Sequence, residues 1–223
     1  MLPAAGFFLG IFFMKFDGLI LDVDGTIWNT TGVVAEAWNK AFDDYFPQVP
    51  HVTADILKGQ FGKTMDVIAD NLFTCLSSED KKNLMKKCCE YEQKAILENQ
   101  KNITYEGVIQ TIRNLYNKIP LFIVSNCQSG YIELVMEKNG ITQYVKDFEC
   151  FGNTRLSKDE NIRLIVKRNN LKAPVYVGDT QGDFDACKKA GVPFIWAAYG
   201  FGRPESEDYY AKLERFQDLE SLL

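Results

Sequence analysis

Two aspartates stand two residues apart, directly after a short apolar run near the start of the chain. Leu19-Ile20-Leu21 is followed by Asp22-Val23-Asp24-Gly25-Thr26. Carboxylates that share a site repel each other and lose hydration on burial, so a positive group must accompany them. Mg²⁺ meets this need, because it prefers oxygen ligands and keeps positions open for water and a substrate phosphate. The segment therefore predicts a buried strand that ends at a reaction site, with an ordinary Asp-Gly turn as the alternative.

Two other binding patterns fail on their spacing. A calcium loop that opened at Asp22 would need glycine and glutamate where the chain has Ile27 and Val33. The run Gly62-Lys63-Thr64 has the ending of a nucleotide-binding P-loop, but the first glycine of that motif would have to stand where the chain has Leu57. Neither pattern is retained.

The composition is that of a globular protein, and it argues against two classes of function. The chain has 223 residues and a formal net charge of −5, so it is long enough for one substantial core plus a smaller lobe. The charge disfavours a nucleic-acid or membrane-surface role, because both need a clustered basic face. The six cysteines form no Cys-x-x-Cys pair, and we expect reduced thiols in a cytoplasmic protein.

Residues 1–13 are almost entirely apolar and uncharged. They are too short to span a bilayer, which takes ~20 residues, and they lack the positive start of a signal peptide. The Met14-Lys15-Phe16 run resembles a second start of translation. We expect residues 1–13 to be an over-called start or a loosely held extension.

Residues 30–100 have the apolar spacing of helices. Apolar side chains recur every three or four positions over 33–45, which predicts one amphipathic helix. Further helices are predicted over 64–73 and 78–97, and Ser77 with Asp80 has the spacing of a capping box at the start of the second of these. No convincing strand is found, so this segment is predicted to be all-helical.

After residue 100 the pattern changes to strands that alternate with helices, which is typical of βαβ units in a parallel sheet. The predicted fold class is α/β, with a Rossmann-like parallel sheet core, helices on both faces and an inserted all-helical cap domain. We predict strands over 121–124, 175–177 and 194–196, and helices over 131–138, 159–169 and 184–190. The expected domains are a catalytic core of residues 14–27 and 101–223, a cap of residues 28–100 and the N-terminal extension 1–13.

Polar residues also follow the later predicted strands. In such folds, ligands bind beyond the carboxyl ends of the strands. Ser125 and Asn126 follow the strand at 121–124 and can donate to phosphate oxygens, or else cap the next helix. Asp179 and Asp183 follow the strand at 175–177, which places acids at a second strand end. Lys158 opens a helix, where the helix dipole disfavours a lysine, so we interpret it as reaching over the same edge.

The ordered set of motifs resembles the haloacid dehalogenase superfamily of aspartate-nucleophile phosphatases. The motifs are Asp22-x-Asp24-Gly-Thr, Ser125-Asn126, Lys158 and Gly-Asp179-x-x-x-Asp183, and the resemblance covers roughly residues 15–223. The runs at 190–196 and 199–202 resemble the phosphoglycolate phosphatase branch. In that branch the first motif is usually followed by Asp-Ser, where this chain has Asn29-Thr30 at the predicted hinge of the cap.

The resemblance implies hydrolysis in two steps. Asp22 would attack phosphorus and form an aspartyl-phosphate. Asp24 would protonate the leaving alcohol and then deprotonate the attacking water. Because these roles need different protonation states, the environments of the two carboxyls must separate their pKa values.

The resemblance also implies a Mg²⁺ cofactor and a phosphate site. The metal would be held by the Asp22 carboxylate, the Asp24 backbone carbonyl and Asp179, with Asp183 orienting the groups around it. The phosphate oxygens would be held by Ser125, Asn126 and Lys158. In the cap, Lys63 is the candidate for contact with the leaving group, with Lys58 as a second candidate.

The implied function is that of a Mg²⁺-dependent phosphatase acting on a small phosphomonoester, similar to phosphoglycolate phosphatases. Two alternatives stay open: a phosphosugar mutase similar to beta-phosphoglucomutase, and, from another class, a non-catalytic phosphate-binding module. A true dehalogenase is disfavoured, because that branch lacks the second acid that Asp24 provides. The expected partner is a small phosphorylated metabolite, without nucleic acid or membrane, and the expected state is a monomer or homodimer.

Overall fold

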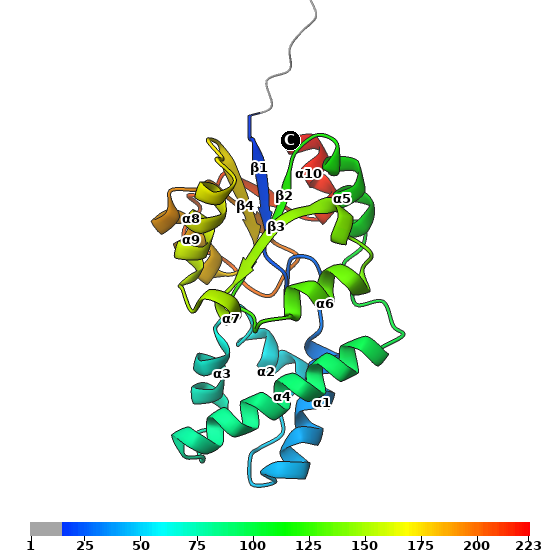
Figure 1. Ribbon diagram of the computed structural model, residues 1–223, viewed down its shortest axis with the longest axis vertical. Helices are drawn as coiled ribbons and strands as arrows, with labels where there is room; N and C mark the ends of the chain where they lie inside the picture. The colour runs from blue at the N-terminus through cyan, green and yellow to red at the C-terminus, as the bar shows by residue number, and fades with distance from the viewer. Residues whose placement is uncertain (1–14) are drawn as a thin grey trace, which may run out of the picture.

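The chain folds around one sheet of six parallel strands (Figure 1). The computed structural model describes residues 15–223, so the predicted extension 1–13 and Met14 lie outside the described residues. The strands are β1 (Gly18–Leu21), β2 (Leu121–Ser125), β3 (Val145–Cys150), β4 (Pro174–Gly178), β5 (Phe194–Ala197) and β6 (Ala211–Leu213). Their order is β3-β2-β1-β4-β5-β6, and every pair is parallel. The order reverses direction at β1 and β4, which makes their carboxyl ends the expected place for a ligand.

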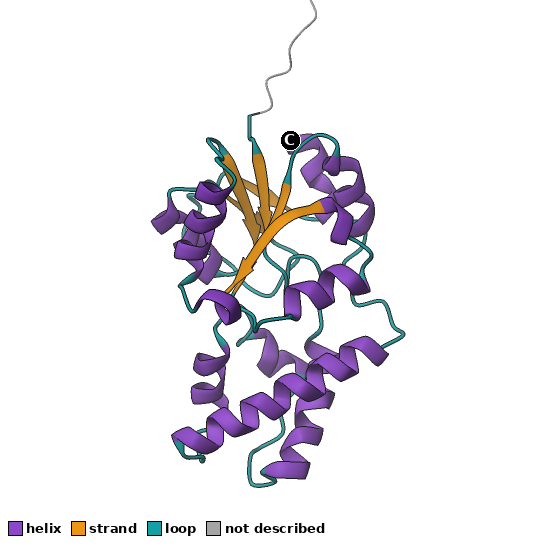
Figure 2. Ribbon diagram, in the orientation of Figure 1, coloured by secondary structure: helices purple, strands orange, loops and turns teal. Residues whose placement is uncertain are grey.

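Helices connect the strands and extend beyond the sheet (Figure 2). Within residues 15–223, no helix combines the length and apolar character that a membrane span requires. The helices are α1 (Thr31–Tyr45), α2 (Ala54–Lys58), α3 (Met65–Leu72), α4 (Ser78–Glu98), α5 (Val108–Tyr116), α6 (Tyr131–Lys138), α7 (Phe151–Thr154), α8 (Lys158–Arg168), α9 (Gln181–Ala190) and α10 (Leu219–Leu222), with 3-10 turns η1 (Thr142–Tyr144) and η2 (Phe216–Asp218).

An apolar cluster lies on each face of the sheet. Alternate residues of a strand point to opposite faces, so a central strand such as β1 contributes to both clusters. In β1, Leu19 and Leu21 belong to the apolar cluster that includes Ile112 of α5. Ile20 belongs to the other cluster, which includes Ile162 of α8. All four β1 residues are buried, which explains why this strand is continuously apolar rather than alternating.

Helices α1 to α4 form a group of their own beyond the carboxyl ends of the strands (Figure 1). The apolar stripe of α1 places Val34, Trp38 and Phe42 in the core, where α1 packs on α4. Helix α4 begins as predicted after Ser77, whose side chain accepts a hydrogen bond from the Asp80 N–H at 3.2 Å. The predicted fold class, a parallel α/β core with an inserted all-helical cap, is confirmed. The domain limits at 28 and 100 remain predictions.

The predicted strands and helices agree with the structure to within a few residues, but the sequence reasoning missed β3, β6, α2, α5, α7 and α10. Strand β3 lies at one edge of the sheet and carries Lys146, Asp147 and Glu149 among its six residues. An edge strand has one open side where charges are tolerated, so it lacks the apolar run of a central strand. Strand β6, at the other edge, has only three residues.

Candidate active site

Two of the predicted aspartates lie side by side because the strands before them are neighbours. Leu21 of β1 pairs with Val177 of β4, and the Asp22 N–H donates to the Val177 carbonyl at 2.9 Å. Asp22 follows β1 directly, and Asp179 follows β4 directly. Both are buried, with exposed fractions of 1% and 0%. Parallel pairing thus brings residues 157 positions apart to one point at the carboxyl ends of the strands.

Lys158 links the first aspartate to the last. Its ammonium donates to Asp22 Oδ1 at 2.8 Å and to Asp183 Oδ1 at 2.5 Å, and it is 5% exposed. The position follows from the start of α8, where Ser157 is the N-cap and its N–H donates to the Glu160 carboxylate at 2.9 Å. The prediction that Lys158 reaches over the strand ends therefore agrees with the geometry.

Asp183 has a donor on each carboxylate oxygen. Oδ1 accepts from Lys158, and Oδ2 accepts from the Thr180 N–H at 2.9 Å and the Thr180 hydroxyl at 2.6 Å. Thr180 is the N-cap of α9, so this carboxylate also caps the helix. Burial opposes the charged form, but Lys158 and Thr180 outweigh it and lower the pKa of Asp183. Asp183 is therefore a fixed anion with little capacity left for a further ligand.

Lys158 is a fixed cation for the corresponding reason. Burial by itself would lower its pKa, but the carboxylates of Asp183 and Asp22 raise that pKa well above its usual range. One buried cation thus faces three buried carboxyls, those of Asp22, Asp179 and Asp183. Such an arrangement is costly for the carboxyl that the cation does not reach.

Asp179 is that carboxyl. Its Oδ2 accepts from the Phe201 N–H at 2.7 Å, whereas its buried Oδ1 has no hydrogen-bond partner among residues 15–223. Burial, and then the charges of Asp183 and Asp22, raise the pKa of Asp179 well above its ordinary value. A buried oxygen without a donor is destabilising unless something binds it.

A small cation fits this cluster. Asp22, Asp179 and Asp183 can each offer an oxygen, and these oxygens lie within 4.8 Å of one another. Because both oxygens of Asp183 already have donors, the free ligands are Asp179 Oδ1 and the second oxygen of Asp22. An all-oxygen donor set with few protein ligands suits Mg²⁺, which usually retains several waters.

Two glycines leave the room that Asp179 occupies. Gly25 has a φ of +84°, and a Cβ there would lie 2.1 Å from Asp179 Oδ2. A Cβ at Gly200 would lie 2.3 Å from the Asp179 Cβ and 2.5 Å from the Gly25 carbonyl oxygen. Both turns therefore require glycine for the acid to sit against them.

Asp24 lies apart from this cluster and has its own set of donors. Its Oδ1 accepts from the Tyr131 hydroxyl at 2.8 Å, the Thr30 hydroxyl at 3.0 Å and the Trp28 indole N–H at 3.1 Å. Sequence reasoning missed all three donors, although Thr30 is one of the two residues at which the chain departs from the pattern of the branch. They hold the carboxyl in one orientation through Oδ1, and none of the three bonds uses Oδ2.

The pKa values of Asp22 and Asp24 are both raised. Burial raises the pKa of Asp22 to about 7, against the opposing effect of Lys158. Burial raises the pKa of Asp24 to about 6, against the hydrogen bonds from Tyr131, Thr30 and Trp28. In the reaction that the resemblance implies, Asp22 must be ionised while Asp24 is protonated, so Asp22 needs the lower pKa of the two. A divalent cation at the Asp22 carboxylate would lower the Asp22 pKa.

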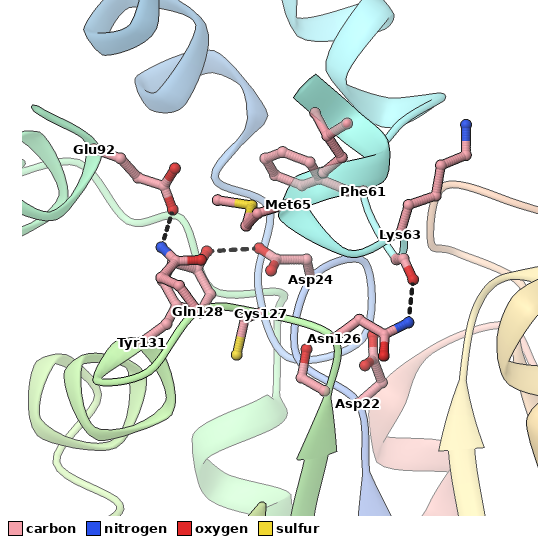
Figure 3. A pocket seen from close by; sticks show the side chains of 13 residues that line it. Asp22, Asp24, Phe61, Lys63, Met65, Glu92, Asn126, Cys127, Gln128 and Tyr131 are labelled. Carbon is pink, nitrogen blue, oxygen red and sulfur yellow. Dashed lines mark hydrogen bonds between the residues drawn. The ribbon is translucent and has the colours of Figure 1, made fainter. Parts of the chain in front are cut away.

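A cavity lies above Asp22 and Asp24, and its lining includes Ser125, Asn126 and Lys63 but not Lys58 (Figure 3). Ser125 is buried at the end of β2 and lines it. Asn126 also lines it, and its amide donates to the Gly62 carbonyl at 2.8 Å, which joins the strand end to the loop before α3. The ammonium of Lys63 points away (Figure 3), donating to the Gly59 carbonyl at 2.9 Å and to Gln60 Oε1 at 3.2 Å. Lys58 pairs with Asp55 at the surface.

The structure therefore brings Asp22, Asp24, Ser125, Asn126, Lys158, Asp179 and Asp183 together, but not the ammonium of Lys63. The roles assigned to these residues remain predictions. The other side chains of the cavity had no signal in the sequence beyond ordinary helix periodicity. They are Phe61, Met65, Ile68, Glu92, Cys127, Gln128 and Tyr131.

Comparison with known proteins agrees with this geometry. Residues 19–197 match the family described as haloacid dehalogenase-like hydrolase. A phosphoglycolate phosphatase from Vibrio parahaemolyticus is 24% identical over 201 residues, which cover 84% of this chain and 86% of that protein.

Two solved structures share the fold. A predicted phosphoglycolate phosphatase from Haemophilus somnus has a TM-score of 0.82 at 19% identity, covering 94% of this chain and 99% of the other. CbbY from Rhodobacter sphaeroides, in complex with phosphate, has a TM-score of 0.76 at 18% identity, covering 92% and 96%. At these identities the likeness concerns the fold alone.

Proposed function

The chain belongs to the haloacid dehalogenase-like hydrolases, and from that premise we propose that it is a Mg²⁺-dependent phosphatase of small phosphomonoesters, similar to phosphoglycolate phosphatases. The observation that carries the proposal is the buried cluster at the β1 and β4 ends. There, one lysine and one unsatisfied carboxylate oxygen flank Asp22. A phosphate group and a divalent cation would complete the charge balance of this cluster.

In the proposed first step, a carboxylate oxygen of Asp22 attacks phosphorus and the bond from phosphorus to the ester oxygen breaks. Asp24, protonated, gives its proton to that oxygen, so the alcohol leaves neutral. In the second step a water molecule attacks the phosphorus of the aspartyl-phosphate and gives its proton to Asp24. The bond to Asp22 breaks, and inorganic phosphate is released with both aspartates restored.

The other residues hold the phosphoryl group and the charge. Lys158, the Ser125 hydroxyl and Asn126 would contact the phosphate oxygens, where charge builds up during transfer. Mg²⁺, held by the Asp22 carboxylate, the Asp24 carbonyl and Asp179, would supply charge neutralisation at the phosphate. Asp183 would act through Lys158 by keeping its ammonium in place.

We also propose that residues 14–27 and 101–223 are the catalytic core and residues 28–100 the cap. The packing of α1 on α4 and the location of helices α1 to α4 beyond the strand ends support this division. The six free cysteines support a cytoplasmic location. The oligomeric state, monomer or homodimer, is part of the proposal that solution measurement must decide.

The test is phosphate release from a panel of phosphomonoesters with Mg²⁺, comparing the wild type with Asp22→Asn. We expect the variant to lose at least ~10³-fold in kcat, because an amide is a poor nucleophile toward phosphorus. Asp43→Asn, a surface substitution next to His51, should leave the rate unchanged. Equal rates in the wild type and Asp22→Asn would refute the assignment of the nucleophile.

A further inference from the structure

The end of the cavity away from Asp22 has walls of a distinct chemical character. Phe61 and Met65 line one side, and Glu92 and Gln128 line another (Figure 3). Ile68 also lines the cavity. Phe61, Met65, Ile68 and Glu92 come from the helical cap segment, and Gln128 follows β2. With the phosphoryl group at Asp22, the alcohol part of an ester would extend toward this end.

Glu92 is a buried carboxyl that the reaction steps do not use. It is 3% exposed, and it lines the cavity from α4. Its Oε2 accepts from the Trp38 indole N–H at 2.9 Å, and its Oε1 accepts from the Gln128 amide at 3.0 Å. These two bonds fix the carboxyl in place at the wall of the cavity. Burial raises the pKa of Glu92 to about 7, so the group is mostly ionised at pH 8.

The cations near the cavity are already engaged elsewhere. Lys158 donates to Asp22 and Asp183 at the phosphate end. The ammonium of Lys63 is turned outward onto Gly59 and Gln60 (Figure 3). Among residues 15–223, the cavity lining contains no other lysine or arginine. A negative charge on the leaving group would therefore lie near the Glu92 carboxylate, and no lysine or arginine of the cavity lining would compensate it.

We propose that this end of the cavity selects phosphomonoesters whose alcohol part has a hydrogen-bond donor and no negative charge, and that Glu92, held by Gln128, is the residue that selects them. The inference rests on the proposed phosphatase function and narrows its substrate class. A carboxylate-bearing ester such as phosphoglycolate meets the Glu92 carboxylate and an apolar wall, whereas a hydroxyl or ammonium group can donate to Glu92.

The first experiment compares three esters with the same two-carbon alcohol and different terminal groups. Phosphoglycolate carries a carboxylate, 2-hydroxyethyl phosphate a hydroxyl and phosphoethanolamine an ammonium. At pH 8 with Mg²⁺, we expect kcat/KM for the hydroxyl and ammonium esters to exceed that for phosphoglycolate by at least about tenfold, because like charges in contact are strongly unfavourable. Binding of the three esters to Asp22→Asn, measured by calorimetry, should follow the same order.

The second experiment changes the selecting charge. Glu92→Gln keeps the size of the side chain and removes its charge; the new amide oxygen can accept from Trp38, and the Gln128 amide can turn over to accept from the new NH2 group. The substitution should reduce the preference over phosphoglycolate by about tenfold. Glu98→Gln is the matched control, because Glu98 is an exposed residue of the same helix, and it should leave the preference unchanged. Thermal unfolding of both variants checks that they fold.

The outcomes separate this inference from the function on which it rests. Preference for phosphoglycolate by the wild type, or an unchanged preference in a folded Glu92→Gln variant, would overturn the inference and leave the phosphatase intact. If neither the three esters nor p-nitrophenyl phosphate released phosphate, the proposed function would fall, and the inference with it.

Discussion

The oxygens of the buried carboxyls at the site are of two kinds. Some accept hydrogen bonds from the protein, and others are open to a ligand. Asp183 has donors on both oxygens, and one oxygen of Asp24 accepts three hydrogen bonds. Asp179 Oδ1 is buried without a donor among the described residues. The satisfied groups fix geometry, and the available oxygens on Asp22 and Asp179 are where a ligand can bind. Single-residue changes should therefore have different effects depending on which kind of oxygen they touch.

Tyr131→Phe removes one of the three donors to Asp24 without changing the ring. The Tyr131 hydroxyl donates at 2.8 Å, so we expect kcat to fall by about tenfold with little change in KM, because the acid is less well oriented. The free energy of unfolding should fall by about 1 kcal/mol. Steady-state kinetics and urea unfolding provide the measurements, with Tyr116→Phe, at an exposed position, as the control. Full activity in Tyr131→Phe would show that this hydrogen bond does not position Asp24.

Glu92 should make the stability depend on pH. Burial raises its pKa from 4.5 to about 7, so the folded state binds the proton more tightly than the unfolded state between these values. The stabilising contribution is present at low pH and is lost as the pH rises through about 7. Relative to Glu92→Gln, the wild type should lose about 2 kcal/mol of unfolding free energy between pH 5 and pH 8. Parallel pH profiles of the two proteins in urea unfolding would contradict this.

At the scale of the elements, the site depends on strand order and on helix starts. Strands β1 and β4 bring Asp22 and Asp179 together, and the starts of α8 and α9 hold Lys158 and Asp183 in place. The turns that carry Gly25 and Gly200 close against Asp179. The cap contributes the opposite wall, and the Asn126 to Gly62 hydrogen bond of 2.8 Å connects the two.

Gly200→Ala should weaken metal binding by displacing Asp179. The new Cβ would lie 2.3 Å from the Asp179 Cβ, which is too close for both to keep their positions. We expect Mg²⁺ affinity, measured by calorimetry, to fall by about 10- to 100-fold. In Gly32→Ala the new Cβ would have no neighbour within 4 Å, so affinity should be unchanged and the start of α1 slightly more stable. Wild-type affinity in Gly200→Ala would argue against Asp179 as a metal ligand.

The whole molecule places one buried charge cluster between the sheet and the cap. One cation, Lys158, faces three buried carboxyls, so the protein without metal retains an electrostatic cost in its interior. Contacts such as Phe61 on Phe201, with ring centroids 6.2 Å apart, hold the cap segment against the core around it. Metal binding should therefore raise the free energy of unfolding of the whole protein, in addition to its effect on activity.

Mg²⁺ should raise the melting temperature of the wild type. At a concentration about 100 times the dissociation constant the stabilisation is about 2.7 kcal/mol, which for a chain of this size corresponds to roughly 5–10 °C. NaCl at matched ionic strength should have little effect. Asp179→Asn should lose the Mg²⁺ shift while remaining folded, as followed by circular dichroism. An equal shift in the variant would mean that the cation binds elsewhere.

The central strands, the long helices and the acids at the strand ends could be predicted from the amino-acid order alone, because apolar periodicity, caps and turns depend on residues close together in the chain. The edge strand β3 could not be predicted, because its charged residues interrupt the apolar pattern by which a strand is recognised. Which side chains surround the cavity depends on how the elements pack in the folded chain. Tyr131 and Asp24 are 107 positions apart, and Gln128 and Glu92 are 36 apart. Contacts between distant residues depend on how the elements pack, which no local pattern encodes.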